Sequence, residues 1–438
     1  MRGFLLIWVG QAASYLGSSI VSFGLTIWAW QETGGATALA LVGFFSFIPT
    51  LLVSPFAGVL VDRWNRKGVM LLSDAGSALA SLVVLLLFNA GALEVWHLYV
   101  LGAWSGLVGA FQFPAFSAAI TTLLPKEQYA RAGGLRSLLN SLAHIGGPVL
   151  AGVLLAFSSL ATLLVVDLIT FSFAVLTLLP VYIPPPAKNE ADAPSRFWDE
   201  LSYGFRYIFS RRSILGLTLM FAAINLVSML GVTVLSPMIL ARSGGDEVLL
   251  GGVRAALGLG GVASGVFISF WGGPKRKVYG VILGVVGGSV ALTAMGVGQS
   301  FLAWVGAAFT AFLFFPMLDA FSGAIFQRKV PPHVQGKFFS ALMVVSHTGT
   351  TLAYLLAGPL ADRVLEPAMK PSGTLGGTFG WLVGTGAGAG MALMFVFAGV
   401  LGVLVGVAAL LYKPVRDLET LLPDHGVNFT RGKSAQRV

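Results

Sequence analysis

Long apolar stretches separated by short polar turns recur along the whole chain. Twelve of them are long enough to cross a bilayer as a helix, which takes about 20 residues. They cover residues 4–30, 38–61, 68–91, 97–123, 133–156, 160–183, 214–240, 248–271, 278–298, 301–327, 338–361 and 386–412. The first run, Phe4–Trp30, is too long for the apolar core of a cleaved signal peptide. The pattern therefore predicts an all-α membrane protein with twelve transmembrane helices.

One long polar segment, Pro184–Asp192, interrupts this pattern. It leads into Phe197–Phe209, where the spacing of apolar residues predicts an amphipathic helix on the membrane surface. We therefore expect a six-helix bundle over 1–183, a cytoplasmic linker with this helix over 184–212, a second six-helix bundle over 213–412, and a cytoplasmic tail over 413–438.

The composition agrees with this interpretation. Of the 438 residues, 56% are hydrophobic and 10% are charged, whereas soluble domains carry about 25% charged residues. This excludes most soluble enzymes. The chain has no cysteine, which excludes disulfides and cysteine-ligated metals. The 56 glycines suit close packing between transmembrane helices.

The positions of the basic residues predict the orientation. If the N-terminus is cytoplasmic, all but four of the 27 lysines and arginines fall on the cytoplasmic side. The four assigned to the outside are Arg242, Arg254, Arg363 and Lys370. The positive-inside rule thus places both termini in the cytoplasm. It also accounts for the net charge of +9 without a nucleic-acid partner.

The two halves show weak internal similarity. Gly58–Trp64 ends segment two, Gly265–Trp271 ends segment eight, and each leads into a short basic loop. Phe113-Pro114 in segment four matches Phe315-Pro316 in segment ten. Such a repeat is typical of transporters that alternate access around a central site.

The loop after segment two carries the pattern Gly58-x3-Asp62-Arg63-x2-Arg66-Lys67. Asp62, at a helix end, could accept hydrogen bonds from backbone N–H groups at the start of a neighbouring helix. The basic residues could bridge to carboxylates, with Glu127 as a candidate partner. Such a latch would hold one end of the two bundles together. The alternative is that these residues only anchor the topology.

This pattern resembles the loop signature of the major facilitator superfamily. Gly134-x8-Ala143-x3-Gly147-Pro148-x2-Ala151-Gly152 in segment five resembles the proline–glycine motif of its drug:proton antiporters. The whole chain is similar to their macrolide-efflux-like third family, through motifs such as Gln327–Pro332 and Ala357–Arg363. One family feature is missing, because Gly102 stands where the segment-four motif has an arginine.

The resemblance implies a secondary transporter in the cell membrane, bacterial inner or plasma membrane, that exports drug-like or macrolide-like amphiphiles in exchange for protons. It implies a monomer whose partners are the amphiphile, protons and membrane lipids. The alternatives are a carrier of the same fold for a siderophore or lysolipid without proton coupling, or a membrane protein that does not transport.

An enzyme is not expected, because no nucleophile–base pair is recognisable. No metal or other cofactor is expected either. The five histidines lack metal-ligand spacing, and Gly426-x5-Gly432-Lys433-Ser434 is one residue too long for a phosphate-binding loop.

Ionisable residues inside membrane segments are candidates for proton coupling, because lipid favours the neutral form of a carboxyl group. They are Asp74, Asp167, Asp319 and His347. We expect Asp319 to carry the proton, since segment ten lines the cavity in the resembled superfamily. Asp74 is expected to be tied to helix ends or loop arginines, and Asp167 is open to either role.

Polar and aromatic residues on the cavity-lining segments are candidates for substrate contact: Gln11, Tyr15, Trp104, Gln112, Asn140 on segment five, Asn225 and Phe315. Such a wall suits a large amphiphile better than a small ion. The alternative is that the aromatic residues face lipid or the helix core.

Overall fold

The computed structural model describes residues 2–125, 142–183 and 197–422, together with the positions Gln128, Ala132, Leu135 and Leu139. Within these residues the regular structure is helical, without strands. Ten of the described helices are long and apolar enough to cross a membrane. The structure confirms the predicted all-α membrane fold.

The first half contains seven described elements. They are α1 Arg2–Thr33, α2 Ala36–Arg63, α3 Arg66–Asn89, α4 Val95–Leu123, the π-helix η2 Leu142–Gly146, α6 Gly147–Phe157 and α7 Leu160–Leu178. Helix α1 packs on α7, α2 packs on α4, and α3 packs on both α4 and α7. A two-residue turn joins α1 to α2, where Gly34 has a φ of +60° that favours glycine.

The second half begins with α8 Phe197–Phe209, a helix whose bounds coincide with those of the predicted amphipathic helix. The following elements are α9 Arg212–Thr233, α10 Leu235–Ser243, α11 Glu247–Trp271, α12 Lys277–Val297, α13 Phe301–Lys329, α14 Pro332–Pro359, the π-helix η3 Leu360–Leu365, α15 Glu366–Ala368, α16 Gly376–Val383, α17 Ala389–Leu411, α18 Lys413–Arg416 and α19 Leu418–Leu421.

Segment seven forms one candidate membrane span, Arg212–Ser243, as predicted, but the helix is interrupted at Val234, where α9 ends and α10 begins. Pro237 explains the break. It has no N–H to donate to the carbonyl of Thr233, and its ring crowds the preceding turn.

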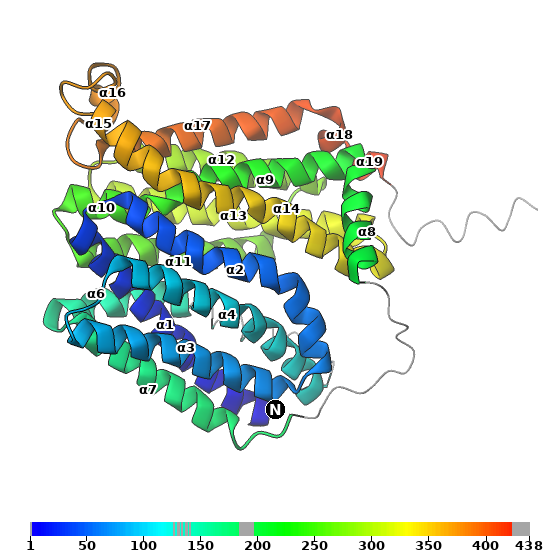
Figure 1. Ribbon diagram of the computed structural model, residues 1–438. Helices are drawn as coiled ribbons and strands as arrows, with labels where there is room; N and C mark the ends of the chain where they lie inside the picture. Colours follow the sequence, from blue (N-terminus) through cyan, green and yellow to red (C-terminus); the bar gives the residue numbers. More distant parts are fainter. Residues whose placement is uncertain are drawn as a thin grey trace, which may run out of the picture.

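The two sets of helices form two lobes that lie side by side (Figure 1). Helices α10, α15 and α16 lie at one end of the lobes, which we call the α16 end. Helices α8, α18 and α19 and the start of α1 lie at the opposite end, which we call the α8 end.

The halves touch mainly where α2 packs on α14 and where η2 and α6 pack on α11. Glycines bring the backbones close together. A Cβ atom added to Gly358 would lie 2.4 Å from the Cα of Thr37, and one added to Gly251 would lie 3.1 Å from the carbonyl oxygen of Pro148. Bulkier residues at these positions would hold the halves apart.

Large apolar side chains cover much of the outer surface. Phe157 is 88% exposed and Phe270 is 90% exposed. Soluble monomers rarely expose such extensive apolar surface, so this surface matches a multi-pass membrane protein whose outer face contacts lipid.

Candidate functional site

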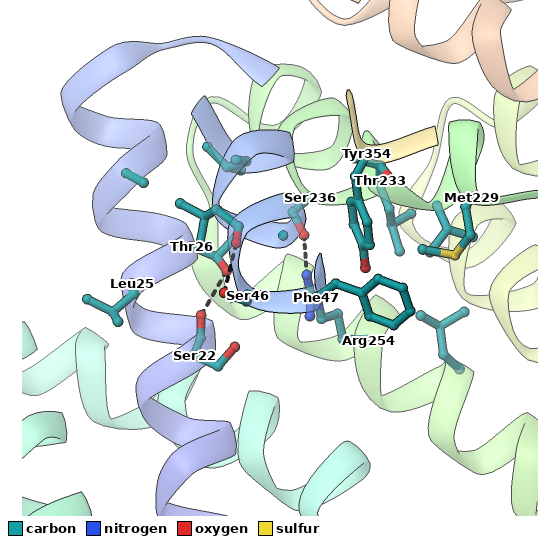
Figure 2. Close-up of a pocket in the computed structure, with 17 residues that line it drawn as sticks. Ser22, Leu25, Thr26, Ser46, Phe47, Met229, Thr233, Ser236, Arg254 and Tyr354 are labelled. Atoms are coloured by element: carbon teal, nitrogen blue, oxygen red, sulfur yellow. Dashed lines mark hydrogen bonds between the residues drawn. The ribbon is translucent and has the colours of Figure 1, made fainter. Parts of the chain in front are cut away.

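A cavity lies between the halves and consists of three adjoining pockets. The first has a volume of about 430 Å³ and is lined from both halves (Figure 2). The second, of about 650 Å³, reaches from Tyr15 on α1 to Phe312 on α13. The third, of about 350 Å³, lies within the first half. Ser22 of α1 lines all three pockets, which therefore adjoin one another around this residue. Volumes of this size are typical of small-molecule sites.

Arg254 is the charged residue that lines both pockets between the halves. It lies two turns into α11, and its Nη2 donates to the Ser236 hydroxyl at 2.7 Å. Its Nε is buried without a hydrogen-bond partner. Figure 2 shows the guanidinium group below Ser236, with the Tyr354 side chain nearby. No carboxylate of the described residues forms an ion pair with it.

The sequence analysis missed Arg254 because it counted this residue with the outer loops. The signal was its position seven residues inside an otherwise apolar helix. An arginine there cannot reach water at the helix end easily, so it faces protein or a cavity.

The break between α9 and α10 shapes the first pocket. Thr233 and Ser236, on either side of the break, both line it. The Thr233 hydroxyl is buried without a hydrogen-bond partner. The interrupted helix therefore places polar groups at membrane depth, where they face a cavity.

The α16 end is closed by Asp362, which lies on η3. Its carboxylate accepts hydrogen bonds from the backbone N–H groups of Ala36 at 2.9 Å and Thr37 at 2.7 Å. These are free N–H groups at the first turn of α2, where the helix dipole also favours an anion. At the same end, Gln31 of α1 donates to Glu247 of α11 at 3.0 Å.

The predicted motif of segment five lies at the other contact between the halves. A Cβ atom added to Gly147 would lie 2.1 Å from the Ser19 hydroxyl oxygen, and one added to Gly152 would lie 3.3 Å from the Glu247 carbonyl oxygen. Pro148 follows the π-helix η2 and lines the second pocket. The motif thus lets α6 approach α1 and α11 closely.

The loop signature after segment two is described in part. Arg66 donates to the carbonyl oxygen of Ala118 at 3.1 Å, and Lys67 donates to that of Leu179 at 2.5 Å. Both contacts lie within the first half. Gly58, Asp62 and Arg63 belong to α2, but their side chains, like Glu127, lie outside the described part of the chain.

Two predicted acids are buried inside the first half. Asp74 is 3% exposed, and its carboxylate accepts from the amides of Gln11 at 3.0 Å and Gln112 at 2.9 Å. It is therefore held by glutamines, and Arg66 of the loop contacts the carbonyl oxygen of Ala118 instead. Asp167 is 1% exposed and accepts from Ser81 at 2.6 Å and Ser18 at 3.4 Å. Asp167 lines the third pocket.

Asp319 and His347 have different surroundings. Asp319 is exposed on α13, two turns from Phe312 on the same helix face, and no described residue donates to its carboxylate. It does not line the three pockets. His347 lies on α14 at its contact with α2, and its ring centre is 5.5 Å from that of Phe47. Its Nδ1 atom is buried without a hydrogen-bond partner among the described residues.

Of the residues predicted to line the cavity, Tyr15 does so. Gln11 and Gln112 instead hold Asp74, and the Trp104 indole donates to the carbonyl oxygen of Gly76 at 2.8 Å. These contacts lie within the first half, the Gln112 Oε1 atom is buried without a hydrogen-bond partner, and none of the three residues lines the three pockets.

The remaining predicted lining residues pack within the second half or are not described. Phe315 packs on Gly288 of α12, and Asn225 contacts Phe221 and Thr350. Phe312, one turn before Phe315, supplies the aromatic wall. Asn140 lies outside the described residues.

Comparison with known proteins agrees with this architecture. Residues 7–354 match the family model of the Major Facilitator Superfamily. The chain is 24% identical over 364 residues to macrolide efflux protein A of Streptococcus pyogenes, covering 82% of this chain and 90% of that protein. It is 25% identical over 372 residues to the multidrug efflux pump Tap of Mycobacterium tuberculosis, covering 80% of this chain and 85% of that protein.

Solved structures show the same fold. A bacterial homolog of the human lysosomal transporter Spinster superposes with a TM-score of 0.66 at 15% identity, covering 92% of this chain and 97% of that one. The nucleoside transporter NupG gives a TM-score of 0.66 at 12% identity, covering 93% of this chain and 98% of that one. The family model spans most of the sequence and the helices have the matching arrangement, so the chain belongs to the major facilitator superfamily.

Proposed function

We propose that this transporter exports amphiphilic small molecules by alternating access, driven by proton influx. The observation that carries the proposal is the cavity between the halves, which is closed at the α16 end by Asp362 and by close glycine contacts. A central cavity closed at one end is what a rocking carrier requires in one of its two states.

The orientation follows from the basic residues. The α8 end carries the linker and the tail, so the positive-inside rule assigns it to the cytoplasm. A further apolar pocket is lined by Phe56 of α2, Phe205 of α8 and Val344 of α14. Because this space lies between α2 and α14, it supports the proposal that the two helices diverge towards the α8 end. The conformation then corresponds to a carrier open to the cytoplasm, the state in which an exporter loads its substrate.

Asp167 is the acid that best fits proton coupling. Among the three aspartates it alone lines the cavity, and it is buried among hydroxyl groups that can serve either protonation state. Asp319, the first choice from the sequence, is exposed and away from the three pockets. A carboxyl group whose access alternates with the cavity could take up a proton on one side and release it on the other.

Export by relatives supports the direction of transport, since both similar proteins named above are described as efflux proteins. The test measures substrate flux and proton movement together, in proteoliposomes that have an imposed pH gradient and contain a trapped pH-sensitive dye. Saturable substrate movement that is coupled to proton movement is expected. Substrate flux without proton movement would indicate an uncoupled carrier, and flux that does not saturate would indicate a channel.

A further inference from the structure

We propose that Arg254 is the substrate-recognition residue of this cavity and that the substrate carries an anionic group, such as a carboxylate, sulfonate or phosphate. The inference rests on the proposed function only in taking the cavity as the substrate site. It specifies the chemistry of the molecule that binds there.

First, the unpaired guanidinium group of Arg254 is unfavourable in free energy inside the membrane. Arg254 remains charged under all ordinary conditions, and a charge in the membrane interior is expensive unless it is paired. Its single described hydrogen bond goes to the neutral hydroxyl of Ser236, and its Nε has none. An anion in the cavity would supply the missing partner through the planar, two-pronged geometry that arginine offers to oxyanions.

The second step is the surroundings of Arg254. In the first pocket, the hydroxyls of Ser236, Thr233 and Tyr354 line the wall near it. Thr233 lines the same pocket, and its hydroxyl is a second polar group that is buried without a hydrogen-bond partner. The guanidinium group and the neighbouring hydroxyl groups can donate hydrogen bonds, and an oxyanion only accepts them. The donors on this wall are therefore complementary to an oxyanion.

Third, the other residues that line the first pocket indicate the chemistry of the rest of the substrate. Leu25, Val42, Met229 and Leu257 make much of the first pocket apolar, so the remainder of the substrate is expected to be hydrocarbon or aromatic. Asp167 is the acid of the adjoining pocket, and it is bonded to Ser81 and Ser18 rather than to Arg254. A substrate with a cationic ammonium group at the Arg254 position would meet an unpaired like charge in a medium of low dielectric constant.

The test uses the full chain in phosphatidylcholine nanodiscs and equilibrium binding without any gradient. The probes are matched pairs that share one apolar body and end in a carboxylate or in a primary amine, such as dansylglycine with dansylethylenediamine and decanoate with decylamine. Thermal stabilisation, followed by tryptophan fluorescence, reports binding. We expect the carboxylate member of each pair to stabilise the wild-type protein more than the amine at millimolar concentration.

Arg254→Gln should weaken carboxylate binding by about tenfold to a hundredfold, the loss expected for a charged hydrogen-bonded pair, and should remove the preference over the amine. Arg254→Lys keeps the charge and should retain the preference at lower affinity. Arg242→Gln is the matched control, because Arg242 binds the carbonyl oxygens of Gly298 and Val383 at the α16 end. It should alter stability without altering the preference.

Equal stabilisation by both members, stronger stabilisation by amines, no stabilisation by either carboxylate, or an unchanged preference in Arg254→Gln would overturn the proposal. If Arg254→Gln does not fold, loss of carboxylate affinity in Arg254→Lys with amine binding unchanged supports it, and equal loss for both probes contradicts it. Because binding is measured at equilibrium, failure of proton-coupled export in proteoliposomes would leave this result unaffected.

Discussion

Asp362 and Thr37 join the two halves of the transporter, because the carboxylate of Asp362 accepts both the backbone N–H of Thr37 at 2.7 Å and its hydroxyl at 2.6 Å. The two residues are 325 positions apart in the chain. Asp362 follows the sequence Gly358-Pro359-Leu360-Ala361, and Asp62 follows Gly58-Val59-Leu60-Val61. The same Gly-x3-Asp-Arg pattern therefore occurs at the last turns of α2 and of the α14–η3 segment, which lie at opposite ends of the molecule.

The first prediction concerns this closure. Asp362→Asn removes the charge and one acceptor, so it should favour opening of the α16 end by about 1–3 kcal/mol. Spin labels at Ala92 and Ser372, both exposed at that end, would report a larger population of long distances. Thr37→Val removes the hydroxyl alone and should have a smaller effect. An identical distance distribution in Asp362→Asn would show that the contact does not hold the end closed.

The second prediction concerns opening of the molecule at the opposite end, the α8 end. If Asp62 performs the corresponding role at the α8 end in the other conformation, Asp62→Asn should increase the population that is open at the α8 end. Labels at Tyr182 and Lys413, both exposed there, would show it. Substrate binding should be largely retained. No change at either pair of labels would leave Asp62 with a role in topology only.

The third prediction is topological. Ser195→Cys should be protected from an impermeant thiol reagent added to intact cells, because the linker is expected in the cytoplasm. The chain has no native cysteine, so the label reports one site. Ala92→Cys, between α3 and α4 at the α16 end, is the control and should be labelled. Labelling of Ser195→Cys from outside would reverse the assigned orientation.

The fourth prediction concerns proton coupling. Asp167→Asn should abolish uphill export driven by a pH gradient and still allow exchange of substrate at equal pH, because asparagine mimics the protonated carboxyl. Asp319→Asn is the comparison in the same assay. Full pumping by Asp167→Asn together with loss in Asp319→Asn would return the role to α13. Normal pumping by both would exclude these two acids.

The fifth prediction separates a structural acid from a coupling acid. The amides of Gln11 and Gln112 both donate to the Asp74 carboxylate, and Asp74→Asn places a third amide N–H₂ group against them. The asparagine oxygen can accept only one of the two bonds, and loss of the other in a buried site should cost about 1–3 kcal/mol of stability. The melting temperature should fall, and gradient-driven export per folded molecule should persist. Unchanged stability with lost pumping would instead make Asp74 a coupling residue.

The sequence predicted those features that depend on local pattern. Apolar length and turn residues located the spans, and the amphipathic period located Phe197–Phe209. It could not predict which groups meet across helices, because Trp104 reaching Gly76 or Gln112 reaching Asp74 depends on helix rotation. Arg254 lies inside an apolar segment, which was a signal in the sequence, but whether its side chain faces a cavity also depends on helix rotation. Likewise, Asp362 was recognised within a motif but not as a partner of α2.

The backbone contacts at the α16 end also determine how the transporter moves between states. Where Gly358 meets Thr37 and Gly251 meets Pro148, dispersion attraction acts over very short distances. A gap of about 1 Å already removes up to half of it. Partial separation would thus lose most of the attraction before new contacts form, which makes half-open arrangements unfavourable. In a single molecule observed over time, the distance between the two halves should switch between two fixed values with no long-lived intermediate. The transport rate would then depend on the frequency of these transitions and not on the amplitude of small movements within one state.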